Sequence, residues 1–158
     1  MRSIKRTIII LAGLALYALT VSGVYAADPF RLVTITKRLN HPWGMAFLPN
    51  GDILVTERRG RLRIVRNGAL DPRPIRGLPK ITARGQGGLL DIALHPRYSE
   101  NGWIYISYVA AGPGGIGTEV ARGKLVRNRL TSLQKIFTLQ PKSSAGRHFG
   151  SRFAFDQN

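Results

Sequence analysis

The chain has 158 residues, contains no cysteine and carries a formal net charge of +16. Its length suits one modest domain, and the lack of cysteine excludes disulfides and cysteine-based zinc or iron–sulfur sites. The positive charge suggests an anionic partner such as nucleic acid. However, the arginines of residues 59–66 alternate with apolar residues, which is typical of the solvated face of a strand. The charge pattern therefore disfavours nucleic-acid binding.

The N-terminus has the pattern of an export signal. Arg2, Lys5 and Arg6 precede an apolar run over residues 7–24, and Val-Tyr-Ala at 24–26 fits a cleavage site. The run also approaches the roughly 20 residues that span a bilayer. We therefore expect residues 1–26 to form an apolar helix that is either a cleaved signal peptide or an N-terminal membrane anchor. The protein is then periplasmic or secreted, or anchored through residues 7–24 and facing the periplasm.

The remainder, residues 27–158, reads as short β-rich runs broken by Gly, Pro, Asn and Asp, without a convincing amphipathic helix. Many short strands separated by turn signals predict an all-β sandwich, barrel or propeller. The expected strands cover residues 31–37, 43–48, 52–57, 61–66, 89–94, 103–109, 119–126 and 133–139, and another begins near residue 152.

An internal repeat favours the propeller. The stretches WGMAFLPNGDILVT (43–56), LLDIALHPRYSENGWIYIS (89–107) and RFAFDQN (152–158) share an apolar–Ala–apolar core at Ala46, Ala93 and Ala154. The intervals between these three alanines suit the length of a four-stranded propeller blade. Because propellers close with about 4–8 blades, we expect about two to two and a half blades here, as the incomplete N-terminal part of a propeller. A complete small β-sandwich is the alternative.

His148 is the strongest candidate for chemistry. It lies in a loop of small residues, where a neutral imidazole can reach a ligand and act as a general base. His41 and His95 each stand beside a proline at a strand end, which favours structural roles. Gln86, between Gly85 and Gly87, offers two donors and one acceptor. It either contacts a planar ligand or caps neighbouring backbone groups.

The acidic residues are too scattered for a confident catalytic pair. Asp91 lies inside an apolar strand, so we expect it to bond an arginine or loop amides. Glu57 precedes two arginines and also predicts an ion pair. No histidine pair has metal-ligand spacing, and no calcium loop is evident.

Three stretches of the chain together resemble a known family: HPWGMAFLPNGDILVTERRGRLRIV, GQGGLLDIALHPRYSENGWIYISY and HFGSRFAFD. In order and spacing they are similar to the N-terminal part of the soluble aldose sugar dehydrogenases, the pyrroloquinoline-quinone-dependent glucose/sorbosone dehydrogenase family. The resemblance covers roughly residues 30–158. It implies a six-bladed propeller with quinone and sugar bound at its top.

The resemblance also implies roles for two residues. His148 matches the base that takes the proton from the C1 hydroxyl of the sugar, and Gln86 matches a glutamine that contacts the quinone. In the family, a hydride passes from C1 to the quinone, a bound calcium ion polarises the cofactor, and an external acceptor takes the electrons.

The resemblance is partial. The family's Lys/Arg cluster for the quinone and its calcium loop lie downstream of the matched region, so we expect this chain alone to be inactive. One alternative is a non-enzymatic periplasmic propeller that binds a ligand. Another is a propeller hydrolase such as a lactonase, for which the sequence shows no metal-binding carboxylate set.

Overall fold

A computed structural model describes residues 30–156 of the chain. The predicted signal peptide or anchor, residues 1–26, lies outside the described residues. A division of the chain after Val33 places every strand of the described residues in the second unit. Within residues 30–156, no helix is long and apolar enough to cross a membrane.

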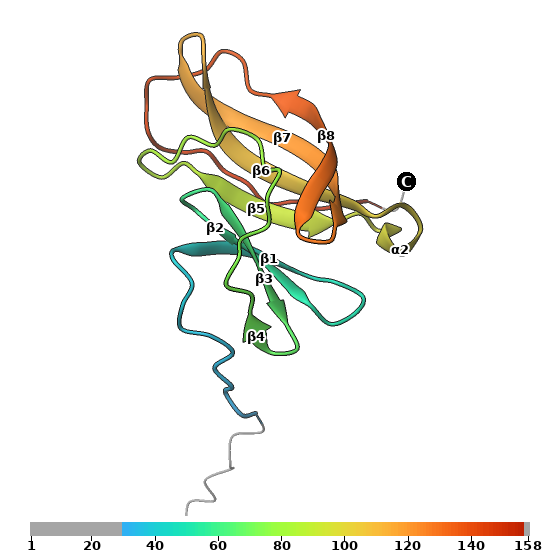
Figure 1. Cartoon of the computed structure of the whole chain (residues 1–158). Coiled ribbons are helices and arrows are strands. Elements are labelled where there is room, and N and C mark those ends of the chain that lie inside the picture. Colours follow the sequence, from blue (N-terminus) through green and yellow to red (C-terminus); the bar gives the residue numbers. More distant parts are fainter. Residues whose placement is uncertain (1–29, 157–158) are drawn as a thin grey trace, which may run out of the picture. The chain divides into compact units, whose positions relative to one another are not determined.

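The second unit contains two four-stranded antiparallel sheets whose strands follow chain order (Figure 1). The first sheet holds β1 (Pro42–Phe47), β2 (Ile53–Glu57), β3 (Arg61–Arg66) and β4 (Ala69–Leu70). The second holds β5 (Leu89–Leu94), β6 (Trp103–Gly112), β7 (Gly115–Val126) and β8 (Arg129–Thr138). A one-turn helix, α2 (Tyr98–Asn101), lies between β5 and β6. The all-β prediction is confirmed.

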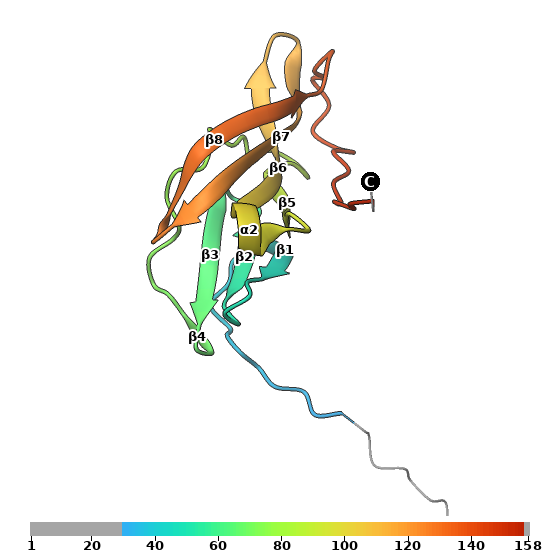
Figure 2. The ribbon, with the colours of Figure 1, turned by 90° about the vertical axis from the view of Figure 1, so that its right-hand side faces the viewer.

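Two predicted strands are wrong. Residues 30–40 contain no strand, because no other part of the described chain pairs with them and a strand needs a neighbour for its backbone hydrogen bonds. Residues 152–156 have no strand pairing. They nevertheless return to β5, as Figure 2 shows, and the Phe153 N–H donates to Asp91 Oδ2 at 2.7 Å. The short β4 and α2 were not predicted.

The sequence repeat corresponds to a repeated structural detail. Each sheet has a register irregularity in its first strand, between Pro42 and Met45 in β1 and between Leu89 and Ile92 in β5. At each one, a hydroxyl from the second strand accepts the backbone N–H of the irregular strand. Thr56 Oγ1 accepts from Gly44 at 2.8 Å, and Ser107 Oγ accepts from Asp91 at 3.0 Å. The repeat thus places a hydroxyl where each first strand bulges.

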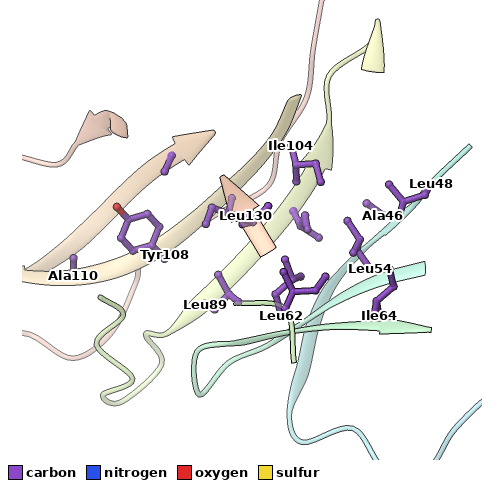
Figure 3. Close-up of a cluster of buried hydrophobic side chains, with 14 residues drawn as sticks. Ala46, Leu48, Leu54, Leu62, Ile64, Leu89, Ile104, Tyr108, Ala110 and Leu130 are labelled. Atoms are coloured by element: carbon purple, nitrogen blue, oxygen red, sulfur yellow. The ribbon is translucent and has the colours of Figure 1, made fainter. Parts of the chain in front are cut away.

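The two sheets pack face to face through one apolar core (Figure 3). Leu54, Leu62 and Ile64 come from the first sheet, and Leu89 and Ile104 come from the second. All five are at most 1% exposed, and each contributes about 1.5–3 kcal/mol through burial. Thr56 also joins the sheets, because its hydroxyl donates to the Leu90 carbonyl at 2.6 Å. This packing brings the loop before β5 beside the loop after β8.

Candidate active site

The two sequence-predicted site residues, Gln86 and His148, line one pocket although 62 residues separate them. The pocket has a volume of about 450 Å³. Its walls come from β1, from the end of β2, from the loop before β5 and from the loop after β8. The lining residues are Trp43, Arg58, Gly85, Gln86, Leu90, His148, Phe149 and Gly150.

Gln86 holds the loop of His148 through two hydrogen bonds. Its side-chain Oε1 accepts the backbone N–H of His148 at 3.0 Å, and its own backbone N–H donates to the Gly146 carbonyl at 2.9 Å. Gln86 therefore caps backbone groups, as one of its two predicted roles requires. The groups that it caps belong to the loop that carries His148, the predicted base. Its Nε2 group carries two further N–H donors on the same pocket-lining side chain.

The loop before β5 and the loop of His148 approach each other so closely that position 85, beside Gln86, requires glycine. Gly85 has φ +59°, and a Cβ atom placed on it would lie 2.1 Å from the Gly146 carbonyl oxygen. Any larger residue would push the His148 loop away. In the structure, the glycine thus makes room for a neighbouring loop of the same chain.

Sequence reasoning missed two pocket residues, Arg58 and Trp43. The guanidinium of Arg58 donates to the Gly85 carbonyl, and its backbone carbonyl accepts the Leu89 N–H at 3.0 Å. Trp43 is 45% exposed and offers an aromatic surface at the pocket. The available signal was that Trp43 begins the first predicted strand of the first repeat and that Arg58 directly follows the second.

His148 is exposed and its backbone has φ 63°, a conformation uncommon outside glycine. The next residue, Phe149, holds the backbone at His148 in place. Phe149 packs against the buried side chains of Leu90, Val109 and Ile116, and its carbonyl accepts the Thr118 hydroxyl at 2.8 Å. The backbone at His148 is therefore held in place, while the imidazole ring remains accessible to a ligand.

Asp91 anchors the chain beyond His148. It is 2% exposed, and its carboxylate accepts the Phe153 N–H at 2.7 Å and pairs with the Arg152 guanidinium at 3.1 Å. The prediction that Asp91 bonds an arginine or loop amides is confirmed. A buried carboxylate in an apolar strand thus ties the chain that follows the loop of His148 to β5.

The other candidates from the sequence have structural partners. His95 Nδ1 accepts the Arg97 N–H at 3.0 Å and contacts Asn101 at 2.9 Å, which closes the turn around α2. His41 Nδ1 contacts Asn40 Oδ1 at 2.7 Å. Glu57 is fully buried and pairs with Arg61 at 2.6 Å, which confirms its predicted ion pair. None of these side chains lines the pocket.

The pocket residues suit a planar, polar organic ligand. An indole face, a guanidinium and a primary amide together supply stacking and hydrogen-bond donors. Residues 30–156 contain no group of three or more His, Asp or Glu side chains arranged to hold a metal. The described pocket residues thus fit a planar quinone.

Comparisons with known proteins show which family the chain is similar to. The family model described as Glucose / Sorbosone dehydrogenase matches residues 39–158. The aldose sugar dehydrogenase YliI of Escherichia coli is 42% identical over 140 residues, which cover 85% of this chain and 38% of that protein.

Two solved structures are also similar. The soluble aldose sugar dehydrogenase of Escherichia coli, in its apo-form, has a TM-score of 0.70 and 42% identity, covering 74% of this chain and 35% of that one. The PQQ-bound aldose sugar dehydrogenase of Streptomyces coelicolor has a TM-score of 0.63 and 28% identity, covering 72% and 35%. The chain spans 35% and 38% of the length of two curated relatives that it matches. The chain belongs to the glucose/sorbosone dehydrogenase family.

Proposed function

We propose that this chain supplies the catalytic base and part of the cofactor pocket of a quinone-dependent aldose dehydrogenase. The observation that carries the proposal is the hydrogen bond from the His148 N–H to Gln86 Oε1, which brings the two predicted residues into one pocket. Family membership and a PQQ-bound relative support the choice of reaction.

His148 would remove the proton from the C1 hydroxyl of the sugar. A neutral imidazole accepts a proton near neutral pH, and the His148 ring is exposed at the pocket. As the proton leaves oxygen, C1 becomes a carbonyl carbon. The quinone, when bound, supplies the acceptor for the hydrogen and two electrons that leave C1.

Gln86, Arg58 and Trp43 would hold the planar cofactor and orient the sugar. Gln86 has two amide N–H donors to offer while its oxygen keeps the His148 backbone in place. Arg58 offers guanidinium donors, and Trp43 offers a stacking face. No step is assigned to calcium, since residues 30–156 contain no group of three or more His, Asp or Glu side chains arranged to hold a metal.

We further propose that the two sheets are consecutive blades of a six-bladed propeller and that residues 152–156 begin a third. The repeated strand irregularity and the return of Phe153 to β5 support this arrangement. Residues 1–26 would direct export or anchor the protein, and residues 27–158 would form the blades. The 158-residue polypeptide tested alone should not turn over sugar, because Gln86 and His148 are exposed and exclude little water.

The test uses the full-length parent protein supplied with the quinone, an aldose and a reducible dye. His148→Gln should lower dye reduction by about 10²–10⁴-fold, the usual scale for loss of a general base. His95→Gln is the matched control, because that ring lies outside the pocket and should leave turnover unchanged. Near-normal turnover of His148→Gln would refute the assignment. Sugar binding without any dye reduction by the unsubstituted protein would favour the alternative of a non-enzymatic binding module.

A further inference from the structure

A buried ion pair lies at the start of the loop that carries His148. We call residues 142–151 the His148 loop. The Lys142 side chain is 4% exposed, and its Nζ lies 2.7 Å from Glu119 Oε1. The same ammonium donates to the Ala110 carbonyl at 3.0 Å. A lysine buried to this degree is uncommon without such partners.

Glu119, the partner of Lys142, is bonded from three neighbouring elements. The Tyr108 hydroxyl of β6 donates to Oε2 at 3.0 Å, and Lys135 of β8 lies 3.4 Å from the same oxygen. Burial alone raises the pKa of Glu119. Hydrogen bonds from Lys142 and Tyr108 and the charges of both lysines outweigh burial and lower it. Glu119 therefore remains a carboxylate at neutral pH.

The backbone after Lys142 is paired with the edge of β7. Ser143 and Ile116 exchange two backbone hydrogen bonds, at 2.9 and 3.1 Å. A Cβ atom on Gly115 would lie 2.2 Å from the Ser143 carbonyl oxygen, and its φ of +138° also favours glycine. The glycine-rich stretch GPGGIG at 112–117 thus makes room for the His148 loop.

From this anchor the loop runs to His148 with few other supports. Gln86 bonds Gly146 and the His148 N–H, and Thr118 bonds Phe149. His148 itself adopts a left-handed conformation, which persists in a non-glycine residue only where the surroundings hold it. The position of the imidazole therefore depends on how firmly the ends of its loop are held.

We propose that the Lys142–Glu119 ion pair positions the His148 loop and thereby aims the imidazole at the pocket. This inference rests on the proposed role of His148 and makes Lys142 and Glu119 positioning residues, not catalytic ones. Neither side chain lines the pocket of Gln86 and His148. Their effect passes through the paired backbone of Ser143 and through Gln86.

Amide hydrogen exchange of the 158-residue chain, followed by NMR, tests the proposal without sugar or quinone. Lys142→Ala should speed exchange of the His148 and Gln86 amides by about 10–100-fold, because it leaves a buried carboxylate with its partner removed. The amides of the β2–β3 ladder should keep their protection. Lys135→Ala is the matched control: its ammonium faces the same carboxylate but its side chain is 55% exposed, so the change should stay below about threefold.

Two further measurements separate positioning from a general structural role. Propylammonium replaces the atoms that Lys142→Ala removes, and its addition should restore protection at His148 and the chemical shifts of the His148 ring. If Lys142→Ala does not fold, the neutral pair Glu119→Gln with Lys142→Met removes the tether without leaving a buried charge. That double variant should also show fast exchange confined to the His148 loop.

Unchanged exchange at His148 in a folded variant would overturn the proposal, and so would an equal rise at every strand amide. These results do not depend on turnover. The positioning proposal can therefore fail while the chemistry of His148 stands, and the reverse also holds.

Discussion

Thr56 forms a hydrogen bond between the two sheets, so substituting it tests how much this contact contributes to stability. It is fully buried, and its hydroxyl accepts the Gly44 N–H at 2.8 Å and donates to the Leu90 carbonyl at 2.6 Å. Thr56→Val keeps the shape of the side chain and removes both hydrogen bonds. One N–H and one carbonyl are then left buried without this partner.

The expected loss of stability follows from these two groups. An unsatisfied buried donor or acceptor costs about 1–3 kcal/mol, and the extra buried methyl of valine returns about 0.8 kcal/mol. Thr56→Val should therefore lower the free energy of unfolding by about 3 kcal/mol. Thr56→Ser keeps the hydroxyl and loses one buried methyl, which costs about 1 kcal/mol.

Urea unfolding of the 158-residue chain and both variants, followed by far-ultraviolet circular dichroism, measures the difference. The m-value should stay constant, because the surface exposed on unfolding barely changes. A Thr56→Val variant as stable as Thr56→Ser would refute the reasoning. It would mean that the Gly44 and Leu90 groups find other partners once the hydroxyl is gone.

Three further predictions concern the His148 loop. Gln86→Leu removes the acceptor of the His148 N–H and should speed exchange of that amide at least as much as Lys142→Ala does, by about 10–100-fold, whereas Gln86→Glu keeps an acceptor oxygen and should not. Asp91→Asn weakens charge-assisted bonds to the chain after His148 and should cost about 1–3 kcal/mol in urea unfolding; Glu100→Gln, which breaks an exposed pair, should cost less than about 0.5 kcal/mol. Because the pKa of Glu119 is lowered in the folded state, its contribution to stability is complete above the unfolded value of about 4.3. That contribution is lost as the pH falls through the lower folded value, so unfolding measured from pH 6 to pH 3 should show a decline that Glu119→Gln makes shallower; an identical pH profile in that variant would contradict this.

Much of the strand pattern could be predicted because its signals are local. Residues 61–66 and 89–94 were placed to the residue, since alternation or a short apolar run between turn residues is a nearest-neighbour property. The predicted strand over 31–37 failed for the opposite reason. Its residues favour strand, but a strand forms only where another supplies hydrogen bonds, and that depends on the neighbours that folding provides.

The candidate site likewise has some features that the sequence predicts and others that only the tertiary structure sets. The sequence by itself determined which residues were candidates for the site, an imidazole in a flexible loop at His148 and an amide between glycines at Gln86, and it indicated a structural role for the acid inside an apolar strand at Asp91. Only the tertiary structure decided that Gln86 bonds the His148 loop, that Arg58 shares their pocket, and that Lys142 anchors the loop in Glu119. These contacts join residues 23–90 positions apart in the chain. No local pattern encodes them, because they arise only when the two sheets pack and bring their loops to the same place.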